Sequence, residues 1–370
     1  MTPTAAAREA TAPAITVRRC GRAHGAGPAN RVQGRAVAIA VALLTVAVSE
    51  GCTSSDPVDS VRIGTSSVGS TFYGLAVAIS ELAYRHQQLN STVQPVGGSV
   101  PNLFALDTNR LDLAIVNAYA AYLAYAGLEP FEHAADIRLV MQGQRTYRHV
   151  LVRRGSGIRS PADFVGKTIV ADRPSNPDML QIMHALIAAY GVRESQVRLI
   201  STTTSSEVMQ AFEVGSIDAA LFPFGEGAAI VQEALTKGLV EFLPLPLDKR
   251  DEALASLPAP VNGTTIPAGT FSDQTEDVHT FSLNAYLLAR TTVDSEIVRE
   301  LVGVIFDQHD ELVDFQGAAR EWTPERALET APVPYHEGTI RYLREAGLWN
   351  EALEQRQQSL LPGLPAPQPR

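Results

Sequence analysis

The chain has 370 residues, of which 45% are hydrophobic and 19% charged, and its formal net charge at pH 7 is −10. This composition is typical of a globular protein and excludes an intrinsically disordered chain, a coiled coil and a polytopic membrane protein. The negative charge argues against a general nucleic-acid-binding protein. The only cysteines are Cys20 and Cys52. Both precede the predicted globular part, so we expect no internal disulfide, cysteine nucleophile or cysteine metal site there.

The first 51 residues differ from the rest in charge and hydropathy. They carry a net charge of +4, so the remaining residues carry −14, and residues 36–48 (AVAIAVALLTVAV) form an uninterrupted apolar run. Such a run is typical of a secretory signal and is too short to span a membrane. It leads into SEGC at 49–52, which resembles a bacterial lipobox. We therefore expect 1–51 to be a lipoprotein signal peptide and Cys52 to be lipidated; ordinary signal cleavage is the alternative.

The globular part is predicted to begin after a polar tether at 52–59. Residues 61–64 indicate a strand that enters a loop of glycine, serine and threonine, and apolar residues then recur at helical spacing from Phe72 to Ala83. Further strands and one helix, over 101–108, are expected in this first series. The strands are at 91–96, 113–116, 139–142 and 150–152. Their alternation with helices favours a parallel sheet that is covered on both faces.

A second α/β series begins near residue 155. Asn176 and Pro177 mark a helix start, as N-cap and first-turn proline. The segments 99–118 and 205–224 align without a gap, and each has a polar loop, a helix and an [LI]-D-x-A turn into a strand. The strands of this series are expected at 168–171, 197–200, 219–222 and 240–243. These patterns predict two similar α/β lobes.

The end of the chain is expected to return to the first lobe. Residues 281–289 indicate a strand, and residues 296–315 a long amphipathic helix, with a final helix at 339–346. We therefore assign 60–150 and 283–355 to lobe I and 151–282 to lobe II. The proline-rich residues 356–370 are expected to form a disordered tail.

Two lobes joined by crossing strands, near 149–154 and 281–290, imply a ligand cleft between them. Ligands of open α/β sheets bind beyond the carboxyl ends of the strands. The loops at these ends are rich in serine, threonine, asparagine and glycine, and several precede helices with unpaired N–H groups. They lie at 65–71, 97–99, 117–119, 174–178, 202–206 and 224–227. Loops of this kind hold a small polar molecule and do no chemistry by themselves.

The sequence shows no catalytic, nucleotide or metal signature. The spacing Gly64, Gly69, Ser70, Thr71 imitates a phosphate-binding loop, but Ser70 stands where lysine is required. The eight histidines show neither HxxH nor HExxH spacing, and no GxSxG nucleophile motif occurs. We therefore expect a protein that is not an enzyme and that uses no cofactor and no metal.

The cleft loops occur within motifs that resemble a known family. IGTSSVGSTFY at 63–73 is similar to the opening GTGGxxGx[YF][YF] of TAXI solute receptors, the binding subunits of tripartite ATP-independent periplasmic (TRAP) transporters. Six further motifs follow in the family's order up to residue 348. They are GGSVPNL, LDLAIVN, SPADFVGK, IDAALF, TIPAGT and PYHEGTIRYL. The resemblance therefore covers nearly all of the predicted globular part.

This resemblance implies a type II periplasmic-binding-protein fold, in which two lobes are joined by hinge strands. It implies a protein that captures a small organic solute (amino acid, amine or carboxylate). Together with the lipobox, we expect a lipid-anchored protein at the outer face of the cytoplasmic membrane. A TRAP-type permease, driven by an ion gradient, would receive the solute; a lipid-anchored sensor that signals occupancy to a membrane partner is the alternative. The implied ligand-binding residues are Thr65, Ser66, Ser67, Thr71, Tyr73, Ser99, Asn117, Ser175, Asn176, Asp178, Phe224 and Gly225.

Two departures from the family pattern concern the ligand. Ser66 and Ser67 replace a common Gly-Gly, which adds hydroxyl groups and removes room. In the second lobe, SNPD at 175–178 stands where the family often has GSGT. Pro177 removes a backbone donor, and Asp178 adds negative charge where an anion would bind. Asp178 thus predicts an amine-bearing or neutral solute, unless its carboxylate only complements the helix dipole.

Overall fold

The computed structural model describes residues 60–272 and 274–361. The predicted signal peptide, Cys52, the tether and the tail residues 362–370 lie outside these ranges. Nowhere in the described ranges is a helix both long and apolar enough to cross a bilayer. All described residues belong to one structural unit.

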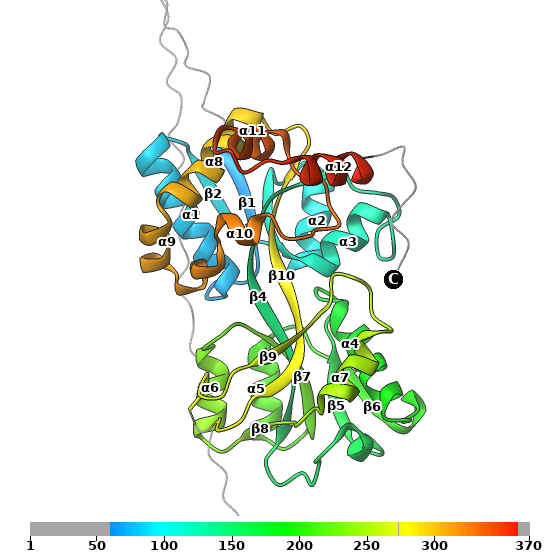
Figure 1. The fold of residues 1–370 in the computed structure, drawn as a ribbon. Coiled ribbons are helices and arrows are strands. Elements are labelled where there is room, and N and C mark those ends of the chain that lie inside the picture. The colour runs from blue at the N-terminus through cyan, green and yellow to red at the C-terminus, as the bar shows by residue number, and fades with distance from the viewer. Residues whose placement is uncertain (1–59, 273, 362–370) are drawn as a thin grey trace, which may run out of the picture. The chain divides into compact units, whose positions relative to one another are not determined.

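A mixed sheet of ten strands runs through the described residues (Figure 1). Eight strands follow the order β2-β1-β3-β10-β4-β7-β5-β6, while β8 pairs with β4 and β9 with β10. The pairs β1–β2, β1–β3, β5–β6 and β5–β7 are parallel, as predicted. The strands are β1 Val61–Thr65, β2 Ser91–Pro95, β3 Leu113–Asn117, β4 Ile137–Arg153, β5 Thr168–Asp172, β6 Arg198–Ser201, β7 Ala219–Phe224, β8 Val240–Phe242, β9 Asn262–Ile266 and β10 Val278–Arg290.

The two long strands β4 and β10 connect the two halves of this sheet. β10 pairs with β9 at 278–282 and with β3 at 285–289, and β4 pairs with β7 at 147–152. β10 therefore exchanges β9 for β3 between residues 282 and 285, whereas β4, which pairs with β10 over 137–148, also pairs with β7 from residue 147 on. We call β1–β3 and the helices on them the first lobe, and β5–β9 with their helices the second lobe. β7 joins β4 two residues before the predicted hinge at 149–154 begins.

β4 corrects the prediction of two separate strands at 139–142 and 150–152. Polar residues break the apolar pattern between these segments, but each finds a partner. Gln142 donates to the Arg326 carbonyl, Gln144 accepts from the Trp322 indole and Thr146 donates to the Leu283 carbonyl. Because each of these side chains has at least one hydrogen-bond partner, the strand continues without interruption.

Helices cover both faces of the sheet and form three apolar cores. One core lies between the first-lobe strands and helices α1 and α8. A second lies between the second-lobe strands and helices α5 and α6. The third contains α2, α3 and α4 and extends along both lobes. The helices are α1 Thr71–Gln87, α2 Ser99–Asp107, α3 Ala118–Ala126, α4 Asp178–Ala189, α5 Ser205–Glu213, α6 Ala229–Thr236, α7 Leu247–Leu254, α8 Ser295–Asp307, α9 His309–Phe315, α10 Pro324–Ala327, α11 Glu337–Glu345 and α12 Glu351–Leu360, with short 3₁₀ turns η1 Pro161–Phe164, η2 Glu194–Gln196 and η3 Gly317–Glu321.

Two C-terminal predictions differ from the structure. The helix expected at 296–315 is divided into α8 and α9 at Gln308, and α9 buries Leu312 and places the His309 ring 3.0 Å from the Ala319 carbonyl oxygen. Residues 356–360, expected in the disordered tail, form the end of α12. The buried Gln357 side chain holds them there, because it accepts from the Tyr335 N–H and donates to the Tyr335 carbonyl.

Candidate functional site

Ser99 and Asn117 lie together at the carboxyl ends of the first-lobe strands. Asn117 ends β3 and caps α3, since its Oδ1 accepts a hydrogen bond of 2.8 Å from the Ala120 N–H. Ser99 is the first residue of α2, and its Oγ accepts from the Asn117 N–H at 3.0 Å. Each residue is only 2% exposed. The helix cap and the hydroxyl thus fix the position of the Asn117 amide.

The loop at 174–178 lies at the carboxyl end of β5 in the second lobe. Asp178 begins α4 and is fully buried, and its Oδ2 accepts a hydrogen bond from Arg148 Nε. The Arg148 guanidinium also donates to Thr146 Oγ1 and to the Tyr147 carbonyl, at 3.0 and 3.1 Å. Asp178 is therefore paired with a cation on the long strand β4. This pairing offsets the negative charge on which the amine hypothesis rests, and the hypothesis itself stays a prediction.

The two loops contact one another across the lobes. Asn117 Nδ2 lies 3.3 Å from both Asn176 Oδ1 and Asp178 Oδ1. The Val100 N–H lies 3.4 Å from the Ser175 carbonyl oxygen. The structure thus brings together five of the predicted ligand-binding residues. They are Ser99, Asn117, Ser175, Asn176 and Asp178.

Gly98 allows this close approach. A Cβ on Gly98 would lie 2.6 Å from Ser175 Cβ, well below a van der Waals contact, and its φ of +139° also favours glycine. Any larger residue at position 98 would therefore push Ser175 and its loop away from the first lobe.

The predicted residues of the opening loop lie in varied surroundings. Thr65 is fully buried and its hydroxyl donates to the Ser66 carbonyl at 3.2 Å. Ser67 and Thr71 are exposed, while Ser66 is half-buried. Tyr73 is half-buried, and its N–H donates to Ser70 Oγ, which caps α1. Their place as ligand contacts stays a prediction.

Phe224, the last residue of β7, and Gly225, which follows it, lie in different surroundings. The Phe224 ring packs with Tyr147, Phe242 and Phe271 in the second-lobe core. Gly225 is half-buried and has open space around its Cα. Phe224 thus contributes first to packing, and the role of both residues toward a ligand stays a prediction.

Three groups, two beside Asp178 and one at the end of β6, were not among the predicted site residues. Arg173 is 7% exposed, and burial together with the Arg148 charge lowers its pKa to about 10. Tyr119 is 6% exposed, and burial, reinforced by the Asp178 charge, raises its pKa to about 12. Thr202 follows β6 and has a buried hydroxyl. The sequence offered one signal for Arg173, which is its position directly before the polar loop at 174–178.

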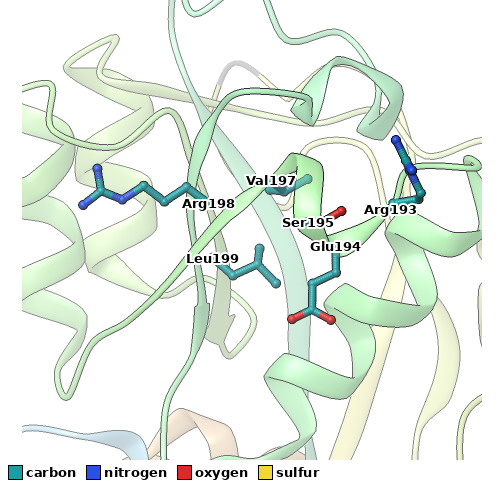
Figure 2. Close-up of a pocket in the computed structure, with 6 residues that line it drawn as sticks. All are labelled: Arg193, Glu194, Ser195, Val197, Arg198 and Leu199. Carbon is teal, nitrogen blue, oxygen red and sulfur yellow. The ribbon is translucent and has the colours of Figure 1, made fainter.

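Two surface hollows were found in the described part of the chain. The larger, of about 660 Å³, lies on the second lobe, and the Arg193 and Arg198 side chains point away from each other there (Figure 2). It contains no predicted site residue. The smaller, of about 470 Å³, adjoins the contact between the lobes. It is lined by Val96, Val100, Pro101, Phe104, Arg110, Pro174 and Ser175.

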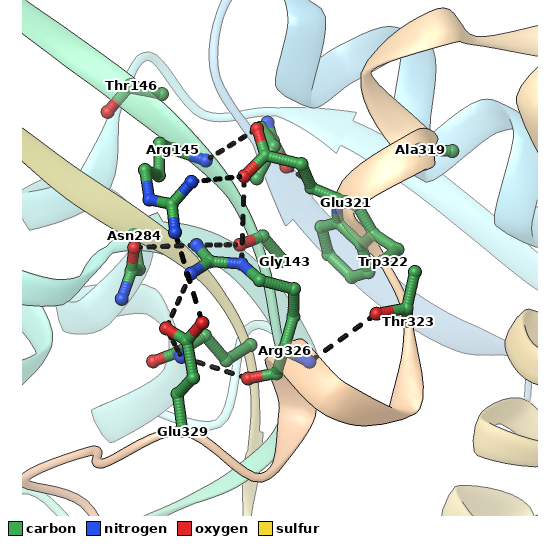
Figure 3. Close-up of polar contacts among 12 residues, drawn as sticks. Gly143, Arg145, Thr146, Asn284, Ala319, Glu321, Trp322, Thr323, Arg326 and Glu329 are labelled. Atoms are coloured by element: carbon green, nitrogen blue, oxygen red, sulfur yellow. Dashed lines mark hydrogen bonds and ion pairs between the residues drawn. The ribbon is translucent and has the colours of Figure 1, made fainter. Parts of the chain in front are cut away.

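A polar cluster holds β4 and β10 where they change partners (Figure 3). Arg326 donates to the Gly143 carbonyl and to Asn284 Oδ1, at 3.0 and 2.8 Å. Arg145 pairs with Glu321 at 3.4 Å and with Glu329 at 4.0 Å. These contacts attach the 317–329 segment to both long strands, so they stabilise the connection between the lobes on the side of the first lobe.

The fold is the two-lobed α/β fold of periplasmic binding proteins, as predicted, and the chain belongs to the NMT1-like family, whose profile matches residues 63–347. PhnD1 from Prochlorococcus marinus (MIT 9301), in complex with methylphosphonate, is 9% identical, with a TM-score of 0.50 over 79% of this chain and 100% of that one. MatC from Rhodopseudomonas palustris with bound malate is 13% identical, with a TM-score of 0.49 over 82% and 100%. The alkanesulfonate-binding protein SsuA from Xanthomonas axonopodis pv. citri, bound to MOPS, is 17% identical, with a TM-score of 0.46 over 82% and 84%.

No group of three or more histidine, cysteine, aspartate or glutamate side chains within residues 60–272 and 274–361 is placed to hold a metal ion.

Proposed function

We propose that this protein is a solute-binding protein that closes its two lobes on a small polar organic molecule. The observation that supports this most strongly is the contact between polar side chains of different lobes, from the buried Asn117 to the half-buried Asn176 and the buried Asp178. Buried polar groups are costly unless they are paired, so their presence on both facing surfaces indicates a polar ligand site rather than a permanent packing contact.

The mechanism is a shift between open and closed forms. A ligand that contacts both lobes binds the closed form more tightly than the open form, and it therefore increases the closed population. The hinge would lie where β10 exchanges β9 for β3, at 282–285, and where β7 joins β4, at residue 147. In this proposal lobe I comprises 60–150 and 283–355, and lobe II comprises 151–282.

We extend the proposal to transport on the basis of the TAXI resemblance. The protein would be exported by its signal peptide, held at the membrane through lipidated Cys52, and would deliver its solute to a TRAP-type permease. It would act without chemistry on the solute. PhnD1, which is similar in fold, is in complex with methylphosphonate, a molecule of the size that we propose. Transport in vesicles with the permease would distinguish delivery from sensing.

Asn117→Asp tests the proposed contact between the lobes. The aspartate keeps an oxygen that caps α3 at the Ala120 N–H, but it has no N–H for Asn176 and it repels Asp178. Isothermal titration with a panel of amino acids, amines, organic acids and sugars should find a ligand of the wild-type chain. The variant should bind it at least about tenfold more weakly, since one cross-lobe hydrogen bond to a charged group is lost.

The matched control is Asn117→Ser, which also caps a helix well but adds no charge. We expect it to lie between the wild type and Asn117→Asp. Absence of saturable binding by any member of the panel, or ligand turnover by the wild type, would contradict the proposed function.

A further inference from the structure

We propose that the solute carries an anionic oxygen group, a carboxylate, sulfonate or phosphonate, and that Arg173 and Thr202 of the second lobe bind this group. This inference rests on the proposed function and names the chemical class of its ligand. We call these two residues the Arg173–Thr202 subsite.

The sheet register places the two residues side by side. β5 and β6 are parallel neighbours in which Asp172 is opposite Ser201, and the Thr202 N–H donates to the Asp172 carbonyl at 3.1 Å. Arg173 and Thr202 are the next residues along the two strands. They therefore leave the sheet together at its carboxyl edge, where ligands of open α/β sheets bind.

The side chains of this subsite have donors without acceptors. Arg173 Nε, Arg173 Nη2 and Thr202 Oγ1 are buried and have no hydrogen-bond partner in the described part of the chain. Arg173 Nη1 lies 3.5 Å from Ser205 Oγ, at the first turn of α5, so the side chain extends toward the N-terminus of that helix. Both the helix dipole and the unpaired N–H groups favour an anion at this point.

The charges around the subsite are not balanced. Arg148 is paired with Asp178, whereas Arg173 joins no ion pair with any described residue. The nearest other acid that acts on it is Glu207, which is exposed and bonded to Thr203 and Thr204 in a capping box. An unpaired buried guanidinium is strongly unfavourable. A ligand with one negative charge would balance it.

The geometry of the unpaired atoms indicates the kind of anion. Nε and Nη2 form one edge of the guanidinium, and that edge donates two parallel hydrogen bonds to two oxygens of the same group. Both carboxylate oxygens of Asp178 are already used, by Arg148 and Asn117. An amine would have to displace these contacts, while an oxygen anion would meet donors that have no other partner.

The first experiment compares matched ligands by titration calorimetry. The probes are malate, glutamate, methanesulfonate and methylphosphonate, the neutral amides or esters of each, and the amines putrescine and ethanolamine. We expect at least one acid to bind the full chain and its neutral analogue to bind at least about 30-fold more weakly. Arg173→Gln should weaken binding of the acid by a similar factor, since two charge-assisted hydrogen bonds are lost.

Arg198→Gln is the matched control variant. Arg198 is exposed on β6 of the same lobe, and the substitution removes the same charge outside the subsite. We expect it to change the affinity less than about twofold, because exposed charges act through water and salt. Equal effects of the two variants would overturn the assignment of Arg173.

A second experiment needs no ligand. If Arg173 is a structural cation, Arg173→Gln should lower the thermal unfolding temperature of the ligand-free chain, as loss of a buried ion pair does. In our proposal the guanidinium is unpaired until the ligand binds, so the variant should unfold at the same temperature as the wild type or higher.

The possible failures are distinct. Binding of a neutral or cationic solute that Arg173→Gln leaves unchanged would overturn the anion inference and leave the proposed function intact. Binding of no solute at all would overturn both. A destabilised ligand-free Arg173→Gln would overturn the inference on its own.

Discussion

The strand-end loops of the two lobes contain similar residue types but differ in how their polar groups are satisfied. In the first lobe, Asn117 uses its amide oxygen, amide nitrogen and backbone N–H, and Ser99 accepts one of these bonds. In the second lobe, Arg173 and Thr202 keep buried donors without a partner among the described residues. The polar surface of the first lobe is therefore fixed before a ligand binds, while the second lobe holds a positive charge that a ligand would neutralise.

Asn102 is an exception close to the first-lobe loops. Its side-chain amide is fully buried and has no hydrogen-bond partner in the described ranges, and it packs against Gly64, where a Cβ would lie 2.5 Å from its Oδ1. This amide is neutral, so the contrast in charge between the two lobes still holds.

The largest effect is expected from Asp178→Asn. The substitution keeps the side-chain volume but leaves the Arg148 and Arg173 guanidiniums without a nearby buried carboxylate. Breaking a buried ion pair from one side lowers the free energy of unfolding by about 3–5 kcal/mol. Urea unfolding of the ligand-free chain measures this. Glu233→Gln, which removes an exposed pair with Lys237, should leave it nearly unchanged, because water and salt screen exposed ion pairs.

Adding Arg173→Gln to Asp178→Asn sharpens this test. The double variant should recover part of the lost stability because one of the two unpaired cations is gone. If the effects of the two substitutions on the free energy of unfolding simply added, Arg173 would not interact with the Asp178 charge. The contrast between the lobes would then be wrong.

The next effect concerns the pH dependence of stability. His149 lies on β4 and is fully buried, with Nδ1 2.9 Å from Thr280 Oγ1, and burial lowers its pKa to about 3. In the unfolded chain the pKa is near 6.5, so between these values only the unfolded chain binds the proton. The free energy of unfolding should therefore fall as the pH falls below 6.5, by about 2–3 kcal/mol at pH 4.5 from this residue.

His149→Asn keeps a polar atom near Thr280 and removes the titrating ring. Urea unfolding at pH 7 and at pH 4.5 should show a smaller acid loss in this variant than in the wild type. His133→Asn, at an exposed position in the first lobe, should keep the wild-type acid loss. An unchanged loss in His149→Asn would show that the second-lobe interior tolerates a charge without a ligand.

A smaller effect is expected from the glycines of the first-lobe loop. Gly97→Ala and Gly98→Ala place alanine at similar positive φ values, +105° and +139°, so both carry backbone strain. Only the Cβ at position 98 meets Ser175. Gly98→Ala should therefore lower the ligand affinity about tenfold beyond the effect of Gly97→Ala, since the added Cβ would keep the Ser175 loop from approaching the first lobe closely. Titration calorimetry of both variants measures the difference, and equal affinities would contradict the proposed contact.

The sequence predicted the fold well because its signals are local. Apolar runs, glycine-rich loops and the repeated [LI]-D-x-A turn placed most strands and the two-lobe order. The continuity of β4 was missed because Gln142, Gln144 and Thr146 look like a loop until Trp322, Arg326 and Leu283 arrive from distant parts of the chain.

The site was predicted in part for the same reason. Ser99, Asn117 and Asn176 lie at strand ends, which periodicity locates. The charge balance was not predicted, since Arg148 is 30 residues from Asp178 and their pairing depends on the register of β4 beside β7. Spacing along the chain shows where polar groups gather, but only tertiary structure shows which of them neutralise each other.

The smallest effect compares one hydroxyl from each lobe. Ser99→Ala removes the acceptor of the buried Asn117 N–H, so it should lower the free energy of unfolding by about 1–2 kcal/mol. Thr202→Val removes a buried hydroxyl that has no partner in the described residues, so it should leave the ligand-free stability unchanged or raise it slightly. With the ligand bound the order should reverse, because Thr202 then has an acceptor to lose. Thermal unfolding of both variants with and without ligand measures all four values, and a destabilised ligand-free Thr202→Val would show that the second lobe satisfies its polar groups as fully as the first.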